Sequence, residues 1–472
     1  MKVYDSGRRD CRRFYRMFQR FFDEGLAQAS FLVGCDRTRQ AVVIDPRRDA
    51  AIYFDAAKQL GASIVAAIET HVHADFVSGA RELAQRGVRL ITGPGAGLRL
   101  DHFEAGDGER FPLGDVTLTF LHTPGHTPEH ISVLAEPPHA TPMIFTGDLL
   151  FVGGVGRPDL LGDDLKRQLA DQLFDSLRRV MKLDERTEVH PGHGAGSLCG
   201  AGIGKEPSTT IGRERLQNAL LQYDDRAAFV AAVLADIPGT PPYFARMKRV
   251  NAEGPPLLAD TWAARPLPAI QPSAAAALSA DGALIIDLRK GDDYAAGHPY
   301  GAINIAFGAK VGFWAGWVVP PDLPLLLLAD DPAQASEAGV QLLRVGLDRV
   351  VGTIEGGAAA WTRAGLPIAT LEQVTAAELR DAVDRGEPMQ LVDVRTPREY
   401  ASGHVPGAIN IPVGEIPARA GELQRDVAVA TVCEGGFRSV LAASLLAREG
   451  ISNLANVTGG MASYRALREV TQ

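Results

Sequence analysis

The sequence contains little cysteine, no long apolar run and no excess of positive charge. Its four cysteines have no short pair spacing, which argues against a disulfide framework or a Cys-rich zinc site and fits a reducing cytoplasm. No run of 18 apolar residues occurs, so we expect neither a membrane-spanning segment nor a membrane partner. The net charge of −9 argues against a general nucleic-acid binder, because phosphate binding depends on concentrated positive charge.

A secretory signal is also missing from the start of the chain. Residues 1–16 are basic and polar and contain no apolar core segment, so we expect a disordered tail there, with Met17 as an alternative start. The length of 472 residues suggests about three domains, and the 46% of apolar residues is ample for their cores.

Histidine is concentrated in one part of the chain. Nine of the eleven histidines lie between His71 and His193. Apolar segments precede a series of imidazoles and carboxylates, namely His71, His73, Asp75, His126, Asp148 and His193. A single histidine of this kind is more simply a core or surface residue. The ordered set, delivered to loops by successive strands, predicts a metal site.

The surrounding segments predict strands with helical cover. Residues 30–35 and 41–45 favour a hairpin, and residues 116–120 alternate apolar and polar side chains as a half-buried strand does. Apolar residues recur at helical spacing between Asp163 and Leu183, which predicts an amphipathic covering helix. The histidine and aspartate series on this framework resembles the metallo-β-lactamase fold, an αββα sandwich with its metal at one edge of the sheets. We expect this domain over residues 17–250.

An internal repeat follows a proline-punctuated segment, residues 251–272, that we interpret as a linker. Strand and helix alternate in each copy, which predicts an α/β multidomain chain whose last two domains have mainly parallel sheets. We expect the copies over 273–369 and 370–472. Polar residues that recur in both copies are interpreted as ion pairs and turn residues that hold the fold. They are Asp287, Arg289, His298, Asp393, Arg395 and His404.

The second copy carries a candidate nucleophile. Its apolar segment 427–432 leads into Cys433-Glu434-Gly435-Gly436-Phe437-Arg438-Ser439 and then into a helix expected over 440–448. Inward-turned backbone amides, the helix N-terminus and Arg438 would together favour a thiolate and hold an anionic sulfur. A buried inert thiol is the alternative. The copy resembles the rhodanese family of sulfurtransferases, whose loop opens with a persulfide-carrying cysteine. In the first copy we expect Asp330 at that place, which would make the copy structural.

Phe76 decides how many metal ions we expect. In the hydrolases of the metallo-β-lactamase family, the residue after the aspartate is a histidine that helps to hold a second zinc ion. A phenylalanine at this position favours a single metal ion, and the pattern resembles the persulfide dioxygenases, which bind one Fe(II). The resemblance implies that His71, His126 and Asp148 are the ligands, as in the facial triad of non-haem iron oxygenases. It makes His73, Asp75 and His193 groups that orient ligands and substrate.

Two further features agree with that resemblance. Gly156-Arg157-Pro158-Asp159 resembles a turn near the dioxygenase site, where Arg157 would pair with a ligand or a substrate anion. Cys199 follows His193 closely and matches a cysteine of the same group, which suggests that it accepts or relays sulfur. A small packing residue is the alternative for Cys199.

The whole arrangement resembles the multidomain persulfide dioxygenase–sulfurtransferases of bacterial sulfide detoxification. The resemblance implies that one Fe(II) per chain supports oxidation of a low-molecular-weight thiol persulfide by O2 to sulfite and the free thiol. It also implies that Cys433, loaded as a persulfide, passes its sulfur to sulfite and gives thiosulfate. By analogy, a homo-oligomer is a candidate assembly.

Two other functions stay open at this point. A zinc thioester hydrolase of the glyoxalase II type shares the fold and most ligands, and ligand spacing alone does not separate iron from zinc. Phe76 speaks against this hydrolase. The other alternative is a catalytically silent sulfur-binding or sensor scaffold in which only the rhodanese loop exchanges sulfur.

Overall fold

The computed structural model describes residues 17–138, 140–235, 237 and 239–469. The predicted disordered tail, residues 1–16, lies outside the described residues. The chain divides into two compact units, with the second starting at Thr261 and the short segment Leu343–Gly346 grouped with the first. Within the described part of the chain, every helix is too short or too polar to cross a membrane.

The first unit is built on two six-stranded sheets, with strand orders β1-β2-β3-β4-β5-β6 and β12-β11-β10-β9-β8-β7. The first sheet consists of β1 (Phe18–Asp23), β2 (Gln28–Cys35), β3 (Gln40–Ile44), β4 (Ser63–Ile68), β5 (Arg89–Thr92) and β6 (Phe103–Glu104). The second sheet consists of β7 (Arg110–Leu113), β8 (Val116–His122), β9 (Ile131–Glu136), β10 (Met143–Gly147), β11 (Glu188–Pro191) and β12 (Thr209–Thr210).

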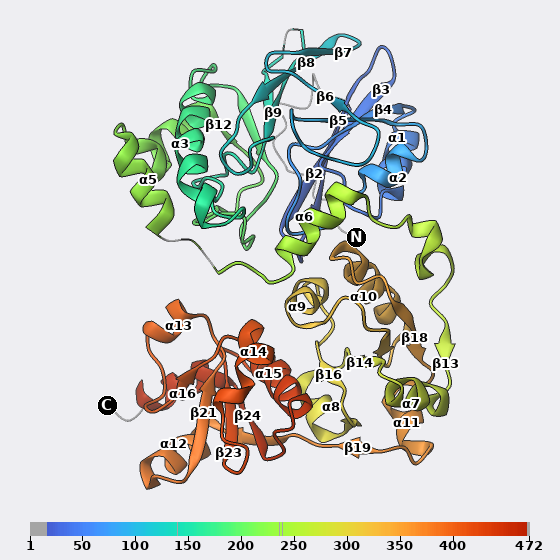
Figure 1. Ribbon diagram of the computed structural model, residues 1–472, viewed down its shortest axis with the longest axis vertical. Helices are drawn as coiled ribbons and strands as arrows, with labels where there is room; N and C mark the ends of the chain where they lie inside the picture. Colours follow the sequence, from blue (N-terminus) through green and yellow to red (C-terminus); the bar gives the residue numbers. More distant parts are fainter. Residues whose placement is uncertain (1–16, 139, 236, 238, 470–472) are drawn as a thin grey trace. The chain divides into compact units, whose positions relative to one another are not determined.

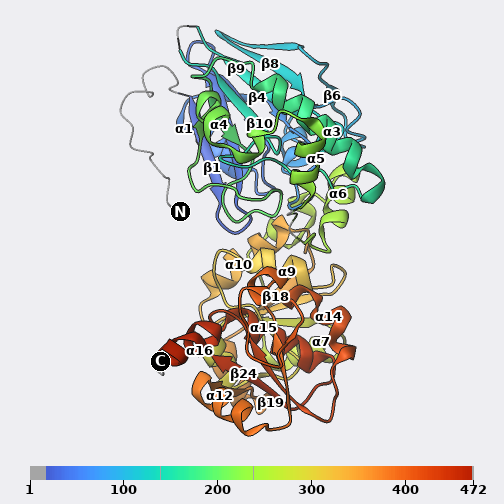
Figure 2. The ribbon, with the colours of Figure 1, turned by 90° about the vertical axis from the view of Figure 1, so that its left-hand side faces the viewer.

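Apolar side chains from both sheets form one core between them. Phe31 from the first sheet meets Phe145 from the second with ring centroids 5.0 Å apart, and both rings are buried. Because a strand turns alternate side chains to opposite faces, each sheet also presents an outer apolar face that needs a cover. Helices supply that cover on opposite sides, as Figures 1 and 2 show. These helices are α1 (Ala51–Gln59), α2 (Ala80–Ala84), α3 (Asp163–Val180) and α5 (Arg226–Ala235).

The predicted αββα sandwich is therefore confirmed. The predicted hairpin is the antiparallel pair β2–β3, and the predicted covering helix is α3. Strand β1 was not predicted. It pairs with β2 along one edge of the first sheet, and most of its side chains are only partly buried, so its sequence shows no clear alternation. The unit is completed by α4 (Ile211–Gln217) and α6 (Phe244–Glu253).

The second unit contains two five-stranded parallel sheets, with orders β13-β18-β17-β14-β16 and β20-β24-β23-β21-β22. The strands of the first are β13 (Ala269–Ile270), β14 (Leu284–Asp287), β16 (Ile303–Asn304), β17 (Leu325–Leu328) and β18 (Val350–Ile354). Those of the second are β20 (Glu372–Thr375), β21 (Met389–Asp393), β22 (Ile409–Asn410), β23 (Ala428–Val432) and β24 (Leu454–Thr458). The short strands β15 (His298–Pro299) and β19 (Ile368–Ala369) pair with each other.

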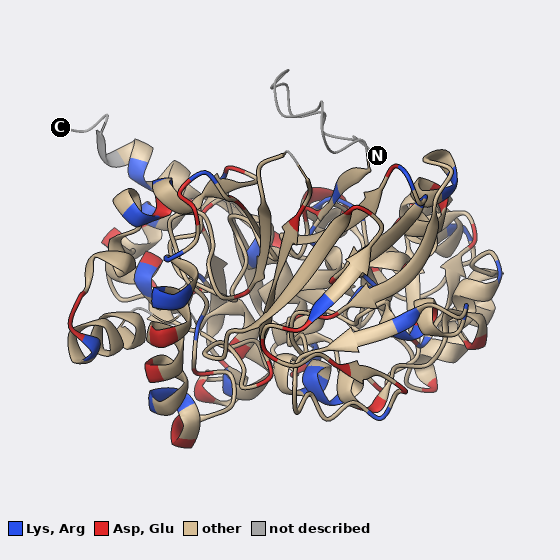
Figure 3. Cartoon of the chain, turned by 90° about the horizontal axis from the view of Figure 1, so that it is seen from above, with Lys and Arg blue, Asp and Glu red and all other residues tan. Residues whose placement is uncertain are grey.

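Helices alternate with these strands, as the repeat predicts. In the first copy they are α7 (Pro272–Ala280), α8 (Gly291–Ala296), α9 (Val311–Val318), α10 (Pro332–Arg344) and α11 (Gly357–Arg363). In the second copy they are α12 (Ala376–Arg385), α13 (Pro397–Ala401), α14 (Ile416–Arg419), α15 (Phe437–Arg448) and α16 (Gly460–Glu469). Across the described chain, acidic and basic residues are interspersed and lie mainly on helices and loops (Figure 3).

The segment interpreted as a linker, residues 251–272, has some regular structure. It contains the short 3-10 helices Leu258–Asp260 and Trp262–Ala264 and strand β13. Each is four residues or fewer, which is below the length at which a hydrophobic period is visible in the sequence.

The polar residues that recur in the two copies do hold turns. Asp287 pairs with Arg289 at 2.6 Å, and Asp393 pairs with Arg395 at 2.7 Å. Each arginine also donates to a glycine carbonyl eight residues on, at 2.8 Å in the first copy and 2.7 Å in the second. The recurring histidines stack on tyrosine rings, with centroids 3.6 Å apart for His298 and 3.7 Å for His404.

Helix α15 starts at Phe437, three residues before the predicted start at Val440. Gly436, with φ 104°, turns the chain directly into the helix. The loop before it is held from the other side by α16, whose Met461 N–H donates to the Cys433 carbonyl at 2.8 Å. At Gly460, with φ 55°, an added Cβ would overlap that same carbonyl.

Gly460→Ala should therefore loosen this anchor. We expect a loss of about 2 kcal/mol or more in local stability, from the left-handed backbone and the overlap together. Hydrogen exchange of the amides in α16, followed by mass spectrometry, measures this loss. Gly421→Ala is the matched control, because an added Cβ there meets no atom within 4 Å. Equal exchange in the two variants would contradict the anchor.

Candidate metal centre and cysteine loop

Three donor atoms without hydrogen-bond partners converge at one edge of the sandwich. His71 follows β4, His126 follows β8 and Asp148 follows β10. His71 Nε2 lies 3.8 Å from Asp148 Oδ2, and His126 Nε2 lies 3.5 Å from the same oxygen. All three atoms are buried and unpaired. An unpaired buried polar atom is costly, and a cation among the three would satisfy them together.

The other polar atom of each residue is fixed by a hydrogen bond. The bonds join His71 Nδ1 to Thr70 Oγ1 at 2.9 Å, His126 Nδ1 to the Arg157 carbonyl at 2.8 Å, and Asp148 Oδ1 to His193 Nδ1 at 2.7 Å. Because a carbonyl only accepts, His126 must carry its proton on Nδ1, which leaves the Nε2 lone pair free. Such outer hydrogen bonds orient metal-binding side chains.

The charges of the three residues also suit a cation. Burial lowers the pKa of His71 well below its ordinary value, helped by the charge of His73, and burial likewise lowers the pKa of His126. Both rings are therefore neutral, as a metal ligand must be. Burial alone would raise the pKa of Asp148, but the charge and hydrogen bond of His193 hold it well below the ordinary value.

Glycine lets the strands approach this closely. Gly147, which precedes Asp148, has φ 46°, and a Cβ there would lie 2.5 Å from Thr70 Oγ1 and 2.7 Å from His130 Nε2. Any larger residue would push β10 away from the loop that carries His71. The distance between Asp148 and His71 thus depends on glycine at position 147.

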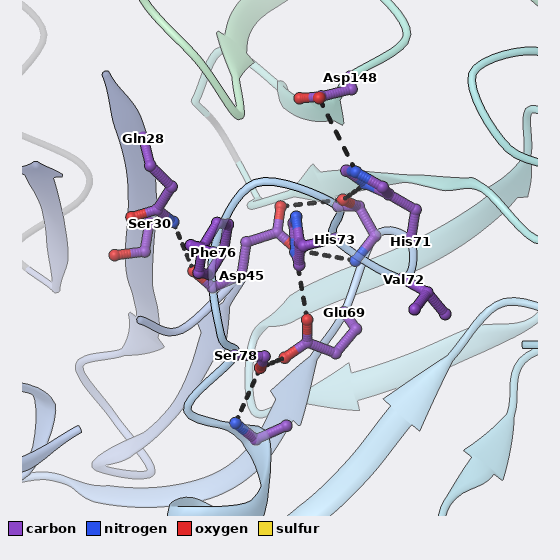
Figure 4. Close-up of polar contacts among 12 residues, drawn as sticks. Gln28, Ser30, Asp45, Glu69, His71, Val72, His73, Phe76, Ser78 and Asp148 are labelled. Carbon is purple, nitrogen blue, oxygen red and sulfur yellow. Dashed lines mark hydrogen bonds and ion pairs between the residues drawn. The ribbon is translucent and has the colours of Figure 1, made fainter. Parts of the chain in front are cut away.

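His73 is directed to two carboxylates (Figure 4). Its Nε2 lies 3.2 Å from Asp45 Oδ1 and 3.2 Å from Glu69 Oε2. Burial opposes the charged form, yet these carboxylates raise the pKa of His73 well above its ordinary value. The ring also lies 4.4 Å, centroid to centroid, from the buried ring of Phe76. The carboxylates thus hold Nε2 of His73, whereas its Nδ1 is buried without a hydrogen-bond partner.

His193 is bridged in a similar way. Its Nδ1 donates to Asp148, and its Nε2 donates to Asp75 Oδ2 at 2.8 Å. The two carboxylates outweigh burial and raise the pKa of His193 to about 10. With both ring nitrogens donating, His193 joins the metal-site aspartate to Asp75. Phe76, the residue after Asp75, is buried and offers no donor atom.

Cys199 and Arg157 lie close by. Cys199 is buried with a donor atom within 4.8 Å of those of Asp75 and His193. Burial and the charges of Asp75 and Asp148 raise the pKa of Cys199 well above its ordinary value, so its thiol is neutral. The Arg157 guanidinium pairs with Asp159 at 2.7 Å and also donates to the Leu198 carbonyl. The contact of Arg157 with the three candidate metal ligands is therefore made by its backbone carbonyl, which accepts a hydrogen bond from His126.

Several residues of the site were not singled out from the sequence. They are Asp45, Glu69, Thr70, Glu129 and His130, which support the loop of His71 through hydrogen bonds and ring contacts. Asp45 lies at the end of the predicted strand 41–45, and its φ of 50° is unusual for a residue other than glycine. The sequence offered one signal for His130, its place within the histidine-rich part of the chain.

The cysteine loop lies at the carboxyl end of β23. Gly436 N–H donates to Cys433 Sγ at 3.1 Å, and Ser439 Oγ lies 3.4 Å from the same sulfur. Arg438, predicted to provide a fixed charge, forms two 2.7 Å hydrogen bonds to Glu399. Cys433 itself is buried, whereas the Phe437 side chain on the first turn of α15 is 38% exposed.

The register of the two sheets corrects one prediction about the first copy. Asp287 lies opposite Leu328, as Asp393 lies opposite Val432. The residue equivalent to Cys433 is therefore Ala329, and Asp330 is equivalent to Glu434. The prediction that Asp330 replaces the cysteine is wrong by one residue, because β17 and its loop have no internal marker of register in the sequence. A methyl group cannot carry sulfur either, so the first copy still lacks the nucleophile.

Comparison with known proteins places both units in families. The metallo-beta-lactamase superfamily model matches residues 23–193, and the rhodanese-like domain model matches residues 271–364 and 375–467. A hydroxyacylglutathione hydrolase of Tolumonas auensis is 36% identical over 33% of this chain and 57% of its own length. The chain thus spans little more than half of that curated relative.

Two other relatives are covered more completely. The mitochondrial persulfide dioxygenase ETHE1 of Bos taurus is 30% identical over 38% of this chain and 68% of its own length. The crystal structure of a metallo-beta-lactamase from Staphylococcus aureus is 33% identical, covers 71% of this chain and 98% of its own, and has a TM-score of 0.63. The chain therefore belongs to the metallo-β-lactamase superfamily, as a fusion of a domain homologous to persulfide dioxygenase with two rhodanese-like domains.

Proposed function

We propose that the protein oxidises a low-molecular-weight thiol persulfide with O2 at a single iron site and transfers sulfur through Cys433. The observation that carries the proposal is the convergence of three unpartnered buried atoms from His71, His126 and Asp148. Two neutral imidazoles and one carboxylate form the donor set of non-haem iron oxygenases. When bound, Fe(II) would supply open coordination positions and the redox capacity for O2 chemistry.

The chain's own residues would keep this site mononuclear and ordered. Phe76 offers no donor atom, and His193 uses both ring nitrogens on carboxylates, so a second cation at Asp75, His193 and Cys199 would have to break one of these hydrogen bonds. Thr70 and the Arg157 carbonyl hold the two ligand rings in one orientation. The overall reaction is RSSH + O2 + H2O giving RSH, sulfite and two protons, in which the outer sulfur is oxidised and O2 is reduced.

The second rhodanese-like domain would handle the sulfite. Cys433, loaded as a persulfide, passes its outer sulfur to sulfite, so one S–S bond breaks at the cysteine and another forms in thiosulfate. Gly436 N–H and Ser439 Oγ hold the cysteine sulfur during this exchange. Both activities on one chain raise the local concentration of the shared intermediate. Cys199 remains a candidate sulfur acceptor beside the metal site.

A zinc thioester hydrolase is the second candidate, favoured by the 36% identity to a hydroxyacylglutathione hydrolase. The two functions separate in one assay of anaerobically purified protein with its native metal. A persulfide dioxygenase consumes O2 when a thiol persulfide is added and leaves glutathione thioesters intact. Thioester cleavage without O2 uptake would establish the hydrolase and overturn the proposal. Neither activity, in protein with bound metal, would favour the silent scaffold.

Metal content should separate His126 from His73. His126→Gln removes one of three donors, so we expect metal per chain to fall at least about tenfold from a value near one. His73→Gln makes the same chemical change at a ring that faces carboxylates, and we expect it to keep its metal. Elemental analysis of anaerobically purified variants measures both. Loss of metal in the His73 variant, or two metal ions in the wild type, would contradict this ligand set.

Cys433→Ser should divide the two activities. We expect O2 uptake with a supplied persulfide to stay within about twofold of wild type, because the metal-site donors all come from the other unit. Thiosulfate should disappear from the products and sulfite should accumulate instead. Cys35→Ser is the control, since Cys35 is a buried strand residue of the sandwich core. Loss of O2 uptake in the Cys433 variant would refute this division of labour.

A further inference from the structure

Glu434 follows the candidate nucleophile Cys433 and forms ion pairs with two arginines, Arg395 and Arg465, at the exposed side of the cysteine loop. Its carboxylate accepts from Arg465 on α16 through both oxygens, at 3.3 Å for one pair of atoms and closer for the other. Arg395 Nη1 lies 3.4 Å from the same carboxylate. Glu434 and Arg465 are both about half exposed, so solvent and donor molecules reach this pair.

The three arginines near the cysteine loop, Arg395, Arg438 and Arg465, each have an acidic partner. Arg395 also forms its buried pair with Asp393, and Arg438 is held by Glu399 through two hydrogen bonds. The arginine and carboxylate charges therefore balance. What remains for an anionic sulfur are neutral groups, with Gly436 N–H donating to Cys433 Sγ and Ser439 Oγ 3.4 Å from it. Such a cradle suits one negative charge on the sulfur better than a compact dianion.

The comparison of the two repeats links the Glu–Arg bridge to the cysteine. Gly357 in the first copy is equivalent to Gly460 in the second, because each starts a helix against the residue at the nucleophile position. Five residues further on, the first copy has Thr362 and the second has Arg465. The acidic residue occurs in both copies, as Asp330 and Glu434, but the arginine that bridges the mouth occurs in the copy that carries Cys433.

An apolar surface lies beside the loop. The half-exposed ring of Phe437 is 6.0 Å, centroid to centroid, from Trp314 on α9 of the first repeat. The organic part of a thiol persulfide can gain contact with these rings, whereas inorganic thiosulfate has no apolar part to place there. The balanced charges around the loop and the apolar surface beside it thus both favour an organic persulfide over thiosulfate as the sulfur donor.

We propose that Glu434 is a specificity-determining residue that makes an organic persulfide, and not the thiosulfate dianion, the preferred sulfur donor to Cys433. The inference rests on the proposed role of Cys433 as a sulfur carrier. In the loading step the Cys433 thiolate attacks the outer sulfur of R–S–SH and forms a new S–S bond. The old S–S bond breaks, and the thiolate R–S⁻ leaves and takes up a proton. The same charge pattern weakens the hold on thiosulfate as a product.

The test compares two donors on the full chain under anaerobic conditions, which silence the O2 chemistry. The donors are thiosulfate, which is a dianion, and 2-mercaptoethanol persulfide, which reacts as neutral R–S–SH and carries at most one negative charge. Loading of Cys433 is followed by mass spectrometry as a function of donor concentration. Glu434→Gln removes one negative charge, worth about fivefold in affinity per unit of donor charge. We expect kcat/KM to rise about 25-fold for thiosulfate and by no more than about fivefold for the persulfide, mainly through KM.

Two further variants show whether charge is the cause. Glu434→Gln combined with Arg465→Gln restores the wild-type charge balance, so the ratio of the two kcat/KM values should return to within about twofold of wild type. Glu387→Gln is the control, because it breaks an exposed ion pair with Arg385 near the amino end of β21, whereas Cys433 lies at the carboxyl end of the neighbouring strand β23. We expect this variant to leave the ratio of the two kcat/KM values unchanged. The gain in Glu434→Gln should also shrink at high salt.

Some outcomes would overturn the inference. They are a wild-type preference for thiosulfate, an unchanged donor ratio in Glu434→Gln, or a gain that survives in the double variant. A separate result would show that the proposed role of Cys433 as a sulfur carrier is wrong. If Cys433→Ser protein takes up as much sulfur as wild type from both donors, Cys433 is not the carrier at all.

Discussion

The first unit depends on how it satisfies polar atoms that its sheets bury. His71, His126 and Asp148 bring three atoms together with no protein partner, and leaving each one unpaired costs about 1–3 kcal/mol. A bound cation removes that cost, whereas the remote atoms of the same side chains are already paired. The neighbouring imidazoles of His73 and His193 donate to carboxylates instead, through Nε2 of His73 and through both ring nitrogens of His193. One cluster of buried histidines is thus separated into neutral candidate ligands and charged bridges.

The two rhodanese-like repeats separate scaffold from chemistry in a comparable way. The aspartate–arginine pair, the tyrosine–histidine stack and the glycine that starts the last helix are present in both copies. The nucleophile position differs, with Ala329 in one copy and Cys433 in the other. Fold-holding contacts are therefore retained where the reactive group is lost. In the second copy, the carboxylates Glu399 and Glu434 then decide how much positive charge the loop offers to an anion.

The sequence predicted what depends on local pattern. Hydrophobic periodicity found the hairpin β2–β3 and helix α3, and the repeat found both parallel sheets. It did not reveal which polar groups meet across the fold. The pairing of His73 with Asp45 and of Arg438 with Glu399 depends on register and rotamer. The misplacement of Asp330 by one residue has the same cause, since an all-leucine strand such as β17 contains no internal marker of register.

We propose a single metal ion bound by two imidazoles and one carboxylate, next to a phenylalanine where a second ion would need a donor. Anomalous X-ray diffraction from crystals of anaerobically purified protein, recorded on both sides of the iron absorption edge, tests this most directly. We expect one iron peak per chain, at bonding distance from His71 Nε2, His126 Nε2 and Asp148 Oδ2. Two bridged metal peaks at that site, with Asp75 and His193 as ligands of the second, would contradict a single metal ion.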